Sequence, residues 1–163
     1  MRLLLIRHAK AEDSSLWPTD AARPLAAEGR RQAEHLGRRL VELGLVCDRL
    51  MSSPLLRARE TADWLHRSGA GTEPEVWEDL APGHDLHELM PTLARQRDAE
   101  VACLGLVGHL PSLVDWAEEL VWGEARGRMV LKPAGVIGLE LPESGQLTAR
   151  TALFWLTSPK LLP

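Results

Sequence analysis

Two histidines stand where buried strands are expected to end. His8 comes directly after Arg7 and the apolar run Leu3–Ile6, and His109 closes a second run of this kind that begins at Val101. Short continuous apolar runs indicate strands buried on both faces, and ligands of open α/β sheets bind beyond the carboxyl ends of such strands. If these two strands are neighbours, both imidazoles lie at one edge of the sheet.

Two arginines give this edge the chemistry of a phosphate site. Arg7 precedes His8, and Arg57 follows a helix start that is predicted by Ser53 as N-cap and Pro54 as the first helical residue. A guanidinium presents a planar fork of donors to phosphoryl oxygens, and the free N–H groups of a helix N-terminus also favour an anion. Nearby positive charge disfavours an imidazolium, so His8 is expected to stay neutral and nucleophilic.

The elements that must position these residues alternate between strands and helices. Strands are predicted at 3–6, 49–51, 101–107, 136–141 and 147–155. Helices are predicted at 25–43, from Ser53 and from Pro111, and at Asp85, where Asp85 and Glu88 form a capping-box pattern. This order favours one domain over 1–163, a three-layer α/β/α sandwich with a largely parallel central sheet.

Composition narrows the class of partner. The net charge of -4 argues against a general nucleic-acid or acidic-membrane binder, and no segment is long and apolar enough to span a bilayer. Cys47 and Cys103 lie in apolar surroundings, and no secretory signal is recognisable, so both are expected to be buried thiols. These features predict a cytoplasmic protein.

Three motifs carry a resemblance to a known family. The segments Leu5–Ala9, Ser52–Ala58 and Gly108–His109 resemble the histidine phosphatase superfamily, the phosphoglycerate-mutase-like enzymes. Arg23-Pro24-Leu25 followed by Gly29, together with His109-Leu110-Pro111, looks like the small SixA-type phosphohistidine phosphatases. The likeness runs from Met1 to about Leu120 and implies the phosphoglycerate-mutase-like fold.

The resemblance also implies roles for individual residues. A phosphohistidine intermediate would form on His8, while Arg7, Arg57 and His109 grip the phosphoryl oxygens, with neither a metal nor another cofactor. Arg23 would lie at the mouth of the pocket or be a surface charge, two alternatives that the sequence leaves open.

A general acid is less clearly marked. In many members of the superfamily, an acidic residue after the second helix protonates the leaving group. Glu78 and Asp79 are both candidates, and Asp79 is favoured because its relation to the following Leu-Ala-Pro resembles the SixA-type pattern. A phosphohistidine substrate leaves as an imidazole, so a strong general acid is not required.

The short chain between Arg57 and His109 leaves little room for the lid expected in larger family members. An open site suits a phosphorylated side chain on another protein, so the predicted substrate is phosphohistidine on a histidine-containing phosphotransfer domain of a signalling relay. One alternative is a phosphomonoesterase acting on a small sugar or glycerate phosphate. Another is a weakly catalytic module that binds phosphoproteins, whereas a mutase would need a closure that this chain lacks.

Overall fold

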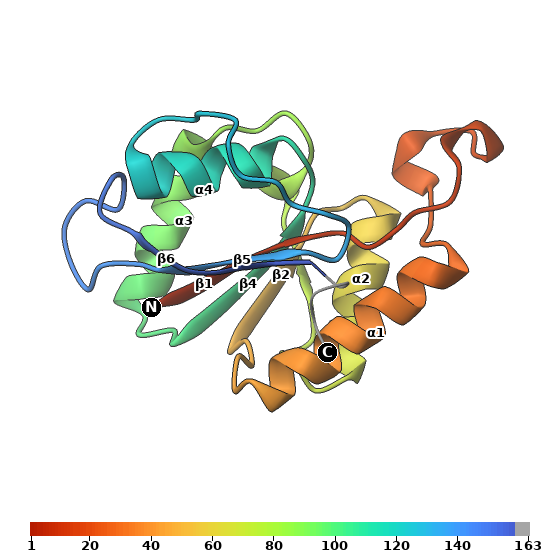
Figure 1. Cartoon of the computed structure of the whole chain (residues 1–163), viewed down its shortest axis with the longest axis horizontal. Coiled ribbons are helices and arrows are strands. Elements are labelled where there is room, and N and C mark those ends of the chain that lie inside the picture. The colour runs from red at the N-terminus through yellow and green to blue at the C-terminus, as the bar shows by residue number, and fades with distance from the viewer. Residues whose placement is uncertain (159–163) are drawn as a thin grey trace.

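A six-stranded mixed sheet forms the centre of the computed structural model, which describes residues 1–158 (Figure 1). The strands, in chain order, are β1 (Arg2–Arg7), β2 (Arg49–Ser52), β3 (Glu75–Val76), β4 (Cys103–Gly108), β5 (Val136–Glu140) and β6 (Ala152–Thr157). Their order across the sheet is β3-β2-β4-β1-β5-β6. The pairs β3–β2, β2–β4 and β4–β1 are parallel, whereas β5 runs antiparallel to both β1 and β6. The predicted α/β fold with a mostly parallel sheet is confirmed.

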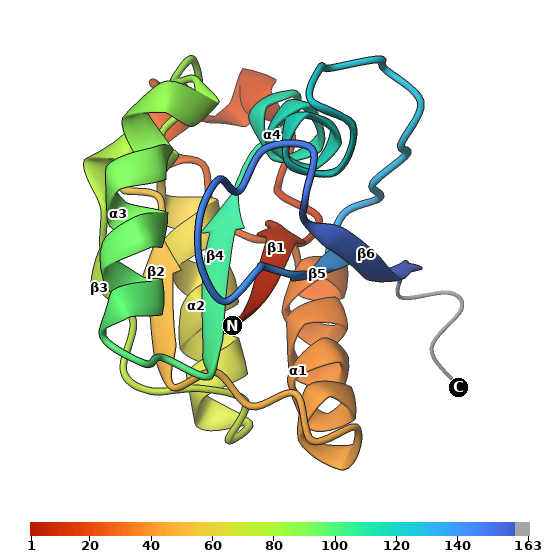
Figure 2. The ribbon, with the colours of Figure 1, turned by 90° about the vertical axis from the view of Figure 1, so that its left-hand side faces the viewer.

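Helices cover both faces of the sheet and complete the three layers (Figure 2). They are α1 (Ala27–Glu42), α2 (Leu56–Arg67), α3 (Leu86–Asp98) and α4 (Ser112–Trp122), with short 3₁₀ turns η1 (Ser14–Leu16), η2 (Asp20–Ala22) and η3 (Glu78–Leu80). One buried cluster joins α1 and α2 to the sheet, and a second joins α3 and α4 to its other face. None of these helices, which lie within residues 1–158, is long and apolar enough to cross a membrane.

The apolar run of β1 follows from its central place in the sheet. Leu3 and Leu5 pack in the core under α3 and α4, while Leu4 and Ile6 pack in the core under α1 and α2. Because successive side chains of a strand point to opposite faces, a strand covered on both faces is apolar at every position. The run must end at Arg7, where the strand leaves the core.

The register of β1 and β4 brings the two histidines together. Arg7 pairs with Gly108, and the backbone N–H of His8 donates to the Gly108 carbonyl oxygen over 3.0 Å. The Ser53 N–H donates to Val107 O, also over 3.0 Å, so the end of β2 lies at the same edge. The predicted neighbourhood of these strand ends is therefore confirmed.

Two local predictions need correction. Ser53 is not the N-cap of α2, because the helix begins at Leu56 with Leu55 in the cap position. The Ser53 hydroxyl oxygen accepts the N–H of Leu55 over 3.3 Å and lies 2.8 Å from His109 Nε2. The strand predicted over 147–155 occupies only Ala152–Thr157, because Leu147 turns inward and the following residues form a turn.

Other local signals are confirmed. The third predicted helix starts as expected: Asp85 caps α3 and forms a capping box with Glu88. Cys47 and Cys103 are both free and buried.

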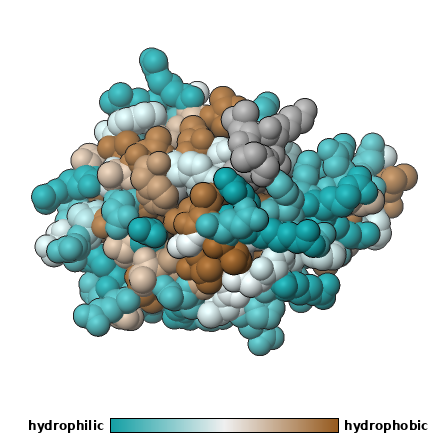
Figure 3. All heavy atoms as spheres, turned by 60° about the horizontal axis from the view of Figure 1, so that its bottom comes forward, coloured by the Kyte–Doolittle hydropathy of each residue, from teal (hydrophilic) through white to brown (hydrophobic). Residues whose placement is uncertain are grey.

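Strand β6 forms one edge of the sheet and exposes apolar side chains. Leu153, Phe154 and Leu156 are each about two-fifths exposed, and Val41 and Leu43 at the end of α1 are exposed as well. The space-filling view shows apolar groups gathered among hydrophilic ones on one face of the molecule (Figure 3). Leu43 and Phe154 line a hollow together with Arg2, at the end of β1 opposite to Arg7.

Candidate active site

His8 is held with one ring nitrogen toward the backbone and the other toward Arg57. Its Nδ1 lies 2.8 Å from the carbonyl oxygen of Ala9, and the Nε of Arg57 lies 3.2 Å from its Nε2. A carbonyl only accepts, so Nδ1 carries the proton and Nε2 has a lone pair. This is the tautomer that a nucleophilic attack from Nε2 needs.

The surroundings of His8 keep it uncharged. Burial is the largest cause, and the charges of Arg57, Arg7 and Arg23 act in the same direction, so that the pKa of His8 falls to about 4 although its bond to Ala9 raises it. The sequence predicted the effect of the arginines. The larger effect of burial needed the tertiary structure.

His109 lies against His8 and is almost fully buried. The two ring centroids are 5.0 Å apart with planes inclined by 52°. The Nε2 of His109 is 2.8 Å from the Ser53 hydroxyl oxygen. Burial, then the neighbouring His8 and the charge of Arg57, lower the pKa of His109 to about 3. His109 is therefore neutral at neutral pH, and its hydrogen bond to Ser53 fixes its ring.

Arg7 is anchored to the loop that precedes β5. Its Nη1 donates to the Leu131 carbonyl oxygen over 2.9 Å, and the backbone N–H of Ala134 donates to the carbonyl oxygens of Arg7 and His8. Burial lowers the pKa of Arg7. A guanidinium is not deprotonated in proteins, so Arg7 keeps its charge at neutral pH.

Arg57 lies in the first turn of α2 and meets a residue that the sequence reasoning missed. Its Nη1 donates to the backbone oxygen of Asp20 over 2.8 Å, and its Nη2 to Asp20 Oδ2 over 2.9 Å. The Nη2 of Arg23 is 3.0 Å from Oδ1 of the same carboxylate. The structure thus places Arg23 on the same carboxylate as Arg57, with its side chain 22% exposed. The only signal for Asp20 in the sequence is its spacing of three from Arg23.

Asp79 and Glu78, the two acid candidates, lie in η3 near the end of β4. The Leu80 carbonyl oxygen is 3.7 Å from the position that a Cβ atom would take at Gly108. Since Gly108 directly precedes His109, η3 lies close to the strand end that carries His109. Asp79 is half-buried and Glu78 is exposed. Within the described residues, neither makes a hydrogen bond or ion pair to the histidine and arginine cluster.

Gly29 brings α1 against the loop that follows His8. A Cβ atom at this position would collide with the backbone carbonyl of Lys10. Only glycine allows this approach. The glycine that contributes to the family resemblance therefore has a packing reason close to the candidate nucleophile.

Buried side-chain nitrogens without partners concentrate in this cluster. Within residues 1–158, four buried side-chain nitrogens have no hydrogen-bond partner, and three of them are Arg7 Nε, Arg23 Nε and His109 Nδ1. Buried polar groups are ordinarily paired, and an anion with several oxygens accepts from several donors at once. The arrangement suits a phosphoryl group.

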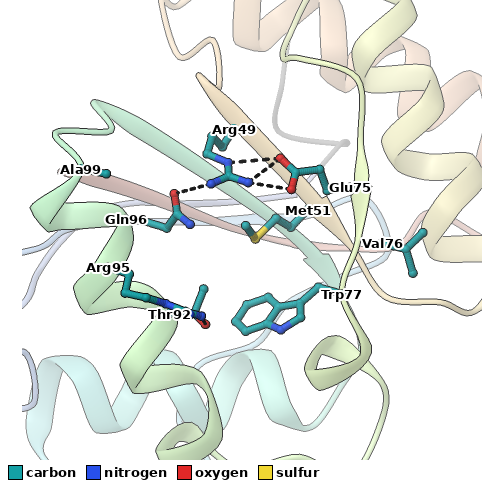
Figure 4. A pocket seen from close by; sticks show the side chains of 9 residues that line it. All are labelled: Arg49, Met51, Glu75, Val76, Trp77, Thr92, Arg95, Gln96 and Ala99. Carbon is teal, nitrogen blue, oxygen red and sulfur yellow. Dashed lines mark hydrogen bonds and ion pairs between the residues drawn. The ribbon is translucent and has the colours of Figure 1, made fainter.

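A separate cavity lies between α3 and the β2–β3 edge (Figure 4). It has a volume of about 460 Å³ and is lined in part by Arg49, Trp77 and Arg95. In the figure, Arg49 is joined to Glu75 and Gln96 by hydrogen bonds and an ion pair. None of the predicted site residues lines this cavity, so it is not the phosphoryl site.

Fold and cluster define an α/β protein that presents two neutral histidines among three arginines, of which Arg57 is buried. The chain belongs to the histidine phosphatase superfamily (branch 1), whose family model matches residues 3–84. An uncharacterized protein of Picosynechococcus sp. is 40% identical over 166 residues, which cover 100% of this chain and 100% of that protein.

Solved structures share the fold. The structure of the protein histidine phosphatase SixA complexed with tungstate superposes with a TM-score of 0.88 at 24% identity, covering 100% of both chains. The alpha-ribazole phosphatase from Shigella flexneri superposes with a TM-score of 0.73 at 18% identity, covering 98% of this chain and 97% of that chain. The predicted superfamily is confirmed, the fold is shared with SixA, and the family supports phosphatase activity for this chain.

Proposed function

We propose that this chain hydrolyses phosphohistidine on a partner protein through a covalent phosphohistidine intermediate on His8. The observation that carries the proposal is the concentration of unpartnered buried side-chain nitrogens of Arg7, Arg23 and His109 around a neutral imidazole. Donors fixed in a buried site stabilise the charge that develops on a phosphoryl group in the transition state.

Two displacements at phosphorus complete the reaction. In the first, the Nε2 lone pair of His8 forms a bond to phosphorus while the bond to the substrate imidazole breaks and its electron pair stays on that imidazole, which takes a proton from solvent. In the second, water forms a bond to phosphorus and releases a proton to solvent, while the bond to Nε2 breaks, its electron pair returns to Nε2, and phosphate leaves. The Nε–H of Arg57 donates to His8 Nε2 in the structure, and it would donate to a phosphoryl oxygen instead when the substrate enters.

A protein substrate is supported by what surrounds the cluster. Between Arg57 and His109 the described chain forms the rest of α2, β3, η3, α3 and β4, and α3 packs on the sheet face instead of over the histidines. The segment joined to Arg57 through Asp20 also exposes Leu16 and Trp17, by 71% and 38%. Exposed apolar side chains beside a site are a typical protein contact surface.

A small phosphate ester is the second candidate. The likeness to an alpha-ribazole phosphatase and the acidic pair in η3 favour it, because an alkoxide leaving group needs a proton donor. Asp79 is the proposed donor for such a substrate.

A direct comparison of substrates tests the proposal. The protein is incubated with a phosphorylated histidine-containing phosphotransfer domain, with p-nitrophenyl phosphate and with a panel of sugar phosphates, and release of phosphate is followed. We expect the highest kcat/KM on the phosphotransfer domain. Turnover of the sugar phosphates alone would refute the protein substrate.

Labelling of the enzyme tests the nucleophile separately. We expect an acid-labile phosphoryl label on the wild-type chain and none on His8→Ala. A label that persists in this variant would exclude His8. Binding of the phosphoprotein without turnover or label would favour the binding-module alternative.

A further inference from the structure

We propose that Asp20 is a positioning residue, which fixes the guanidinium of Arg57 so that its Nε edge faces His8. This inference rests on the proposed function, since it assigns a part in phosphoryl transfer. Asp20 is itself more than half exposed, whereas Arg57 is buried. A surface carboxylate thus holds the inner arginine in place.

The donors of Arg57 are divided between two partners. The two terminal nitrogens, Nη1 and Nη2, bond the backbone oxygen and the carboxylate of Asp20 at 2.8 and 2.9 Å. The Nε donates to His8 Nε2 at 3.2 Å. A guanidinium has five N–H donors on a rigid plane, so gripping its end fixes the direction of the Nε side. That side then faces the place where a phosphoryl group bonded to Nε2 must lie.

The same carboxylate fixes a second cation. Its Oδ1 is 3.0 Å from Arg23 Nη2, so one aspartate bridges two guanidinium groups. Thr19 helps to shape this contact, because its hydroxyl accepts the Ala22 N–H and closes the η2 turn in which Asp20 lies. The hydrogen bond and charge of Arg57 and the charge of Arg23 lower the pKa of Asp20 against the opposing effect of burial. The bridge is therefore ionic at neutral pH.

A rival role for Asp20 makes the opposite prediction. If the carboxylate merely occupied the phosphoryl position, its removal would tighten anion binding and leave the chemical step unchanged. The geometry disagrees, because Asp20 lies at the end of the guanidinium and His8 at its Nε. Fixed donors act on the transition state more than on the bound substrate, so loss of the anchor is expected to lower kcat more than it raises KM.

The test compares Asp20→Asn with Asp13→Asn, a matched change in the same segment. Asp13 caps η1 through Ser15 and, among residues 1–158, makes no hydrogen bond or ion pair to Arg57. For Asp20→Asn we expect kcat to fall by about tenfold or more with KM within about threefold, and for Asp13→Asn both within about twofold. Thermal unfolding midpoints of both variants should match the wild type. A second readout is the Arg57 Nε–H resonance in ¹H–¹⁵N spectra, which should be protected from exchange in the wild type and lost in Asp20→Asn.

Each result has one meaning. The positioning role is overturned if kcat of Asp20→Asn is unchanged, with or without tighter inhibition by inorganic phosphate. In that case the proposed function still stands, provided that the wild type turns over its phosphoryl substrate. A wild type that neither hydrolyses a phosphoryl substrate nor becomes labelled on His8 overturns both.

Discussion

The protonation of His8 gives the sharpest prediction. An imidazole with an ordinary pKa of 6.5 is about 3% neutral at about pH 5, whereas one with a pKa of about 4 is about 90% neutral there. Since only the neutral ring attacks phosphorus, the two cases differ by a factor of about 30 in reactive enzyme at that pH. We therefore expect phosphorylation of His8 to stay near its neutral-pH rate down to about pH 5.

The measurement has a direct and a kinetic arm. Imidazole resonances are titrated by NMR, with His8 assigned by its loss in His8→Gln, and single-turnover labelling is timed over the same pH range. Arg57→Gln removes one of the charges that lower the pKa, so its His8 midpoint should lie higher than in the wild type. A wild-type midpoint near 6.5 would refute the account of burial and charge given for this site.

The same shift affects stability with a definite sign. Between the folded pKa of about 4 and the unfolded value of 6.5, the unfolded chain binds more protons than the folded one, so the free energy of unfolding falls as pH drops through this window. The loss is complete below the folded pKa and amounts to at most about 3 kcal/mol from His8. Urea unfolding of the wild type and His8→Gln at several pH values measures this loss of stability. An equal pH dependence of the unfolding free energy in both proteins would contradict the contribution assigned to His8.

Three further outcomes follow from the structure. Asp79→Asn should lower kcat on a sugar phosphate, whose leaving group is an alkoxide, by about tenfold or more and on phosphohistidine by less than about threefold, with Glu78→Gln as the control; equal losses on both substrates would exclude a leaving-group role. Trp17→Ser should raise KM for a phosphorylated partner protein severalfold and leave p-nitrophenyl phosphate unchanged, and a constant KM in steady-state assays would remove this segment from the contact surface. Glu118→Gln should lower the free energy of unfolding by about 2–3 kcal/mol in urea titrations, because its buried carboxylate accepts the backbone N–H groups of 126–129; a loss no larger than in Glu119→Gln would contradict this.

Some features could be predicted because their cause is local. The apolar runs before His8 and His109 indicate strands buried on both faces, and the Asp85 and Glu88 pattern caps α3 through bonds within one turn. These signals depend on residues a few positions apart. Ser53 shows where such reasoning fails. Its hydroxyl oxygen accepts the N–H of Leu55, which is itself the cap residue of α2, and it also bonds His109, a residue remote in the chain.

The sequence by itself determined the alternation of strands and helices, the histidine phosphatase motifs and the candidates His8, Arg7, Arg57 and His109, since residue type and short spacing carry this information. Only the tertiary structure decided that Asp20 bridges Arg57 to Arg23 and that burial outweighs charge in lowering the pKa of His8. Both depend on distances between segments remote in the chain, which packing around the sheet sets and no local pattern encodes.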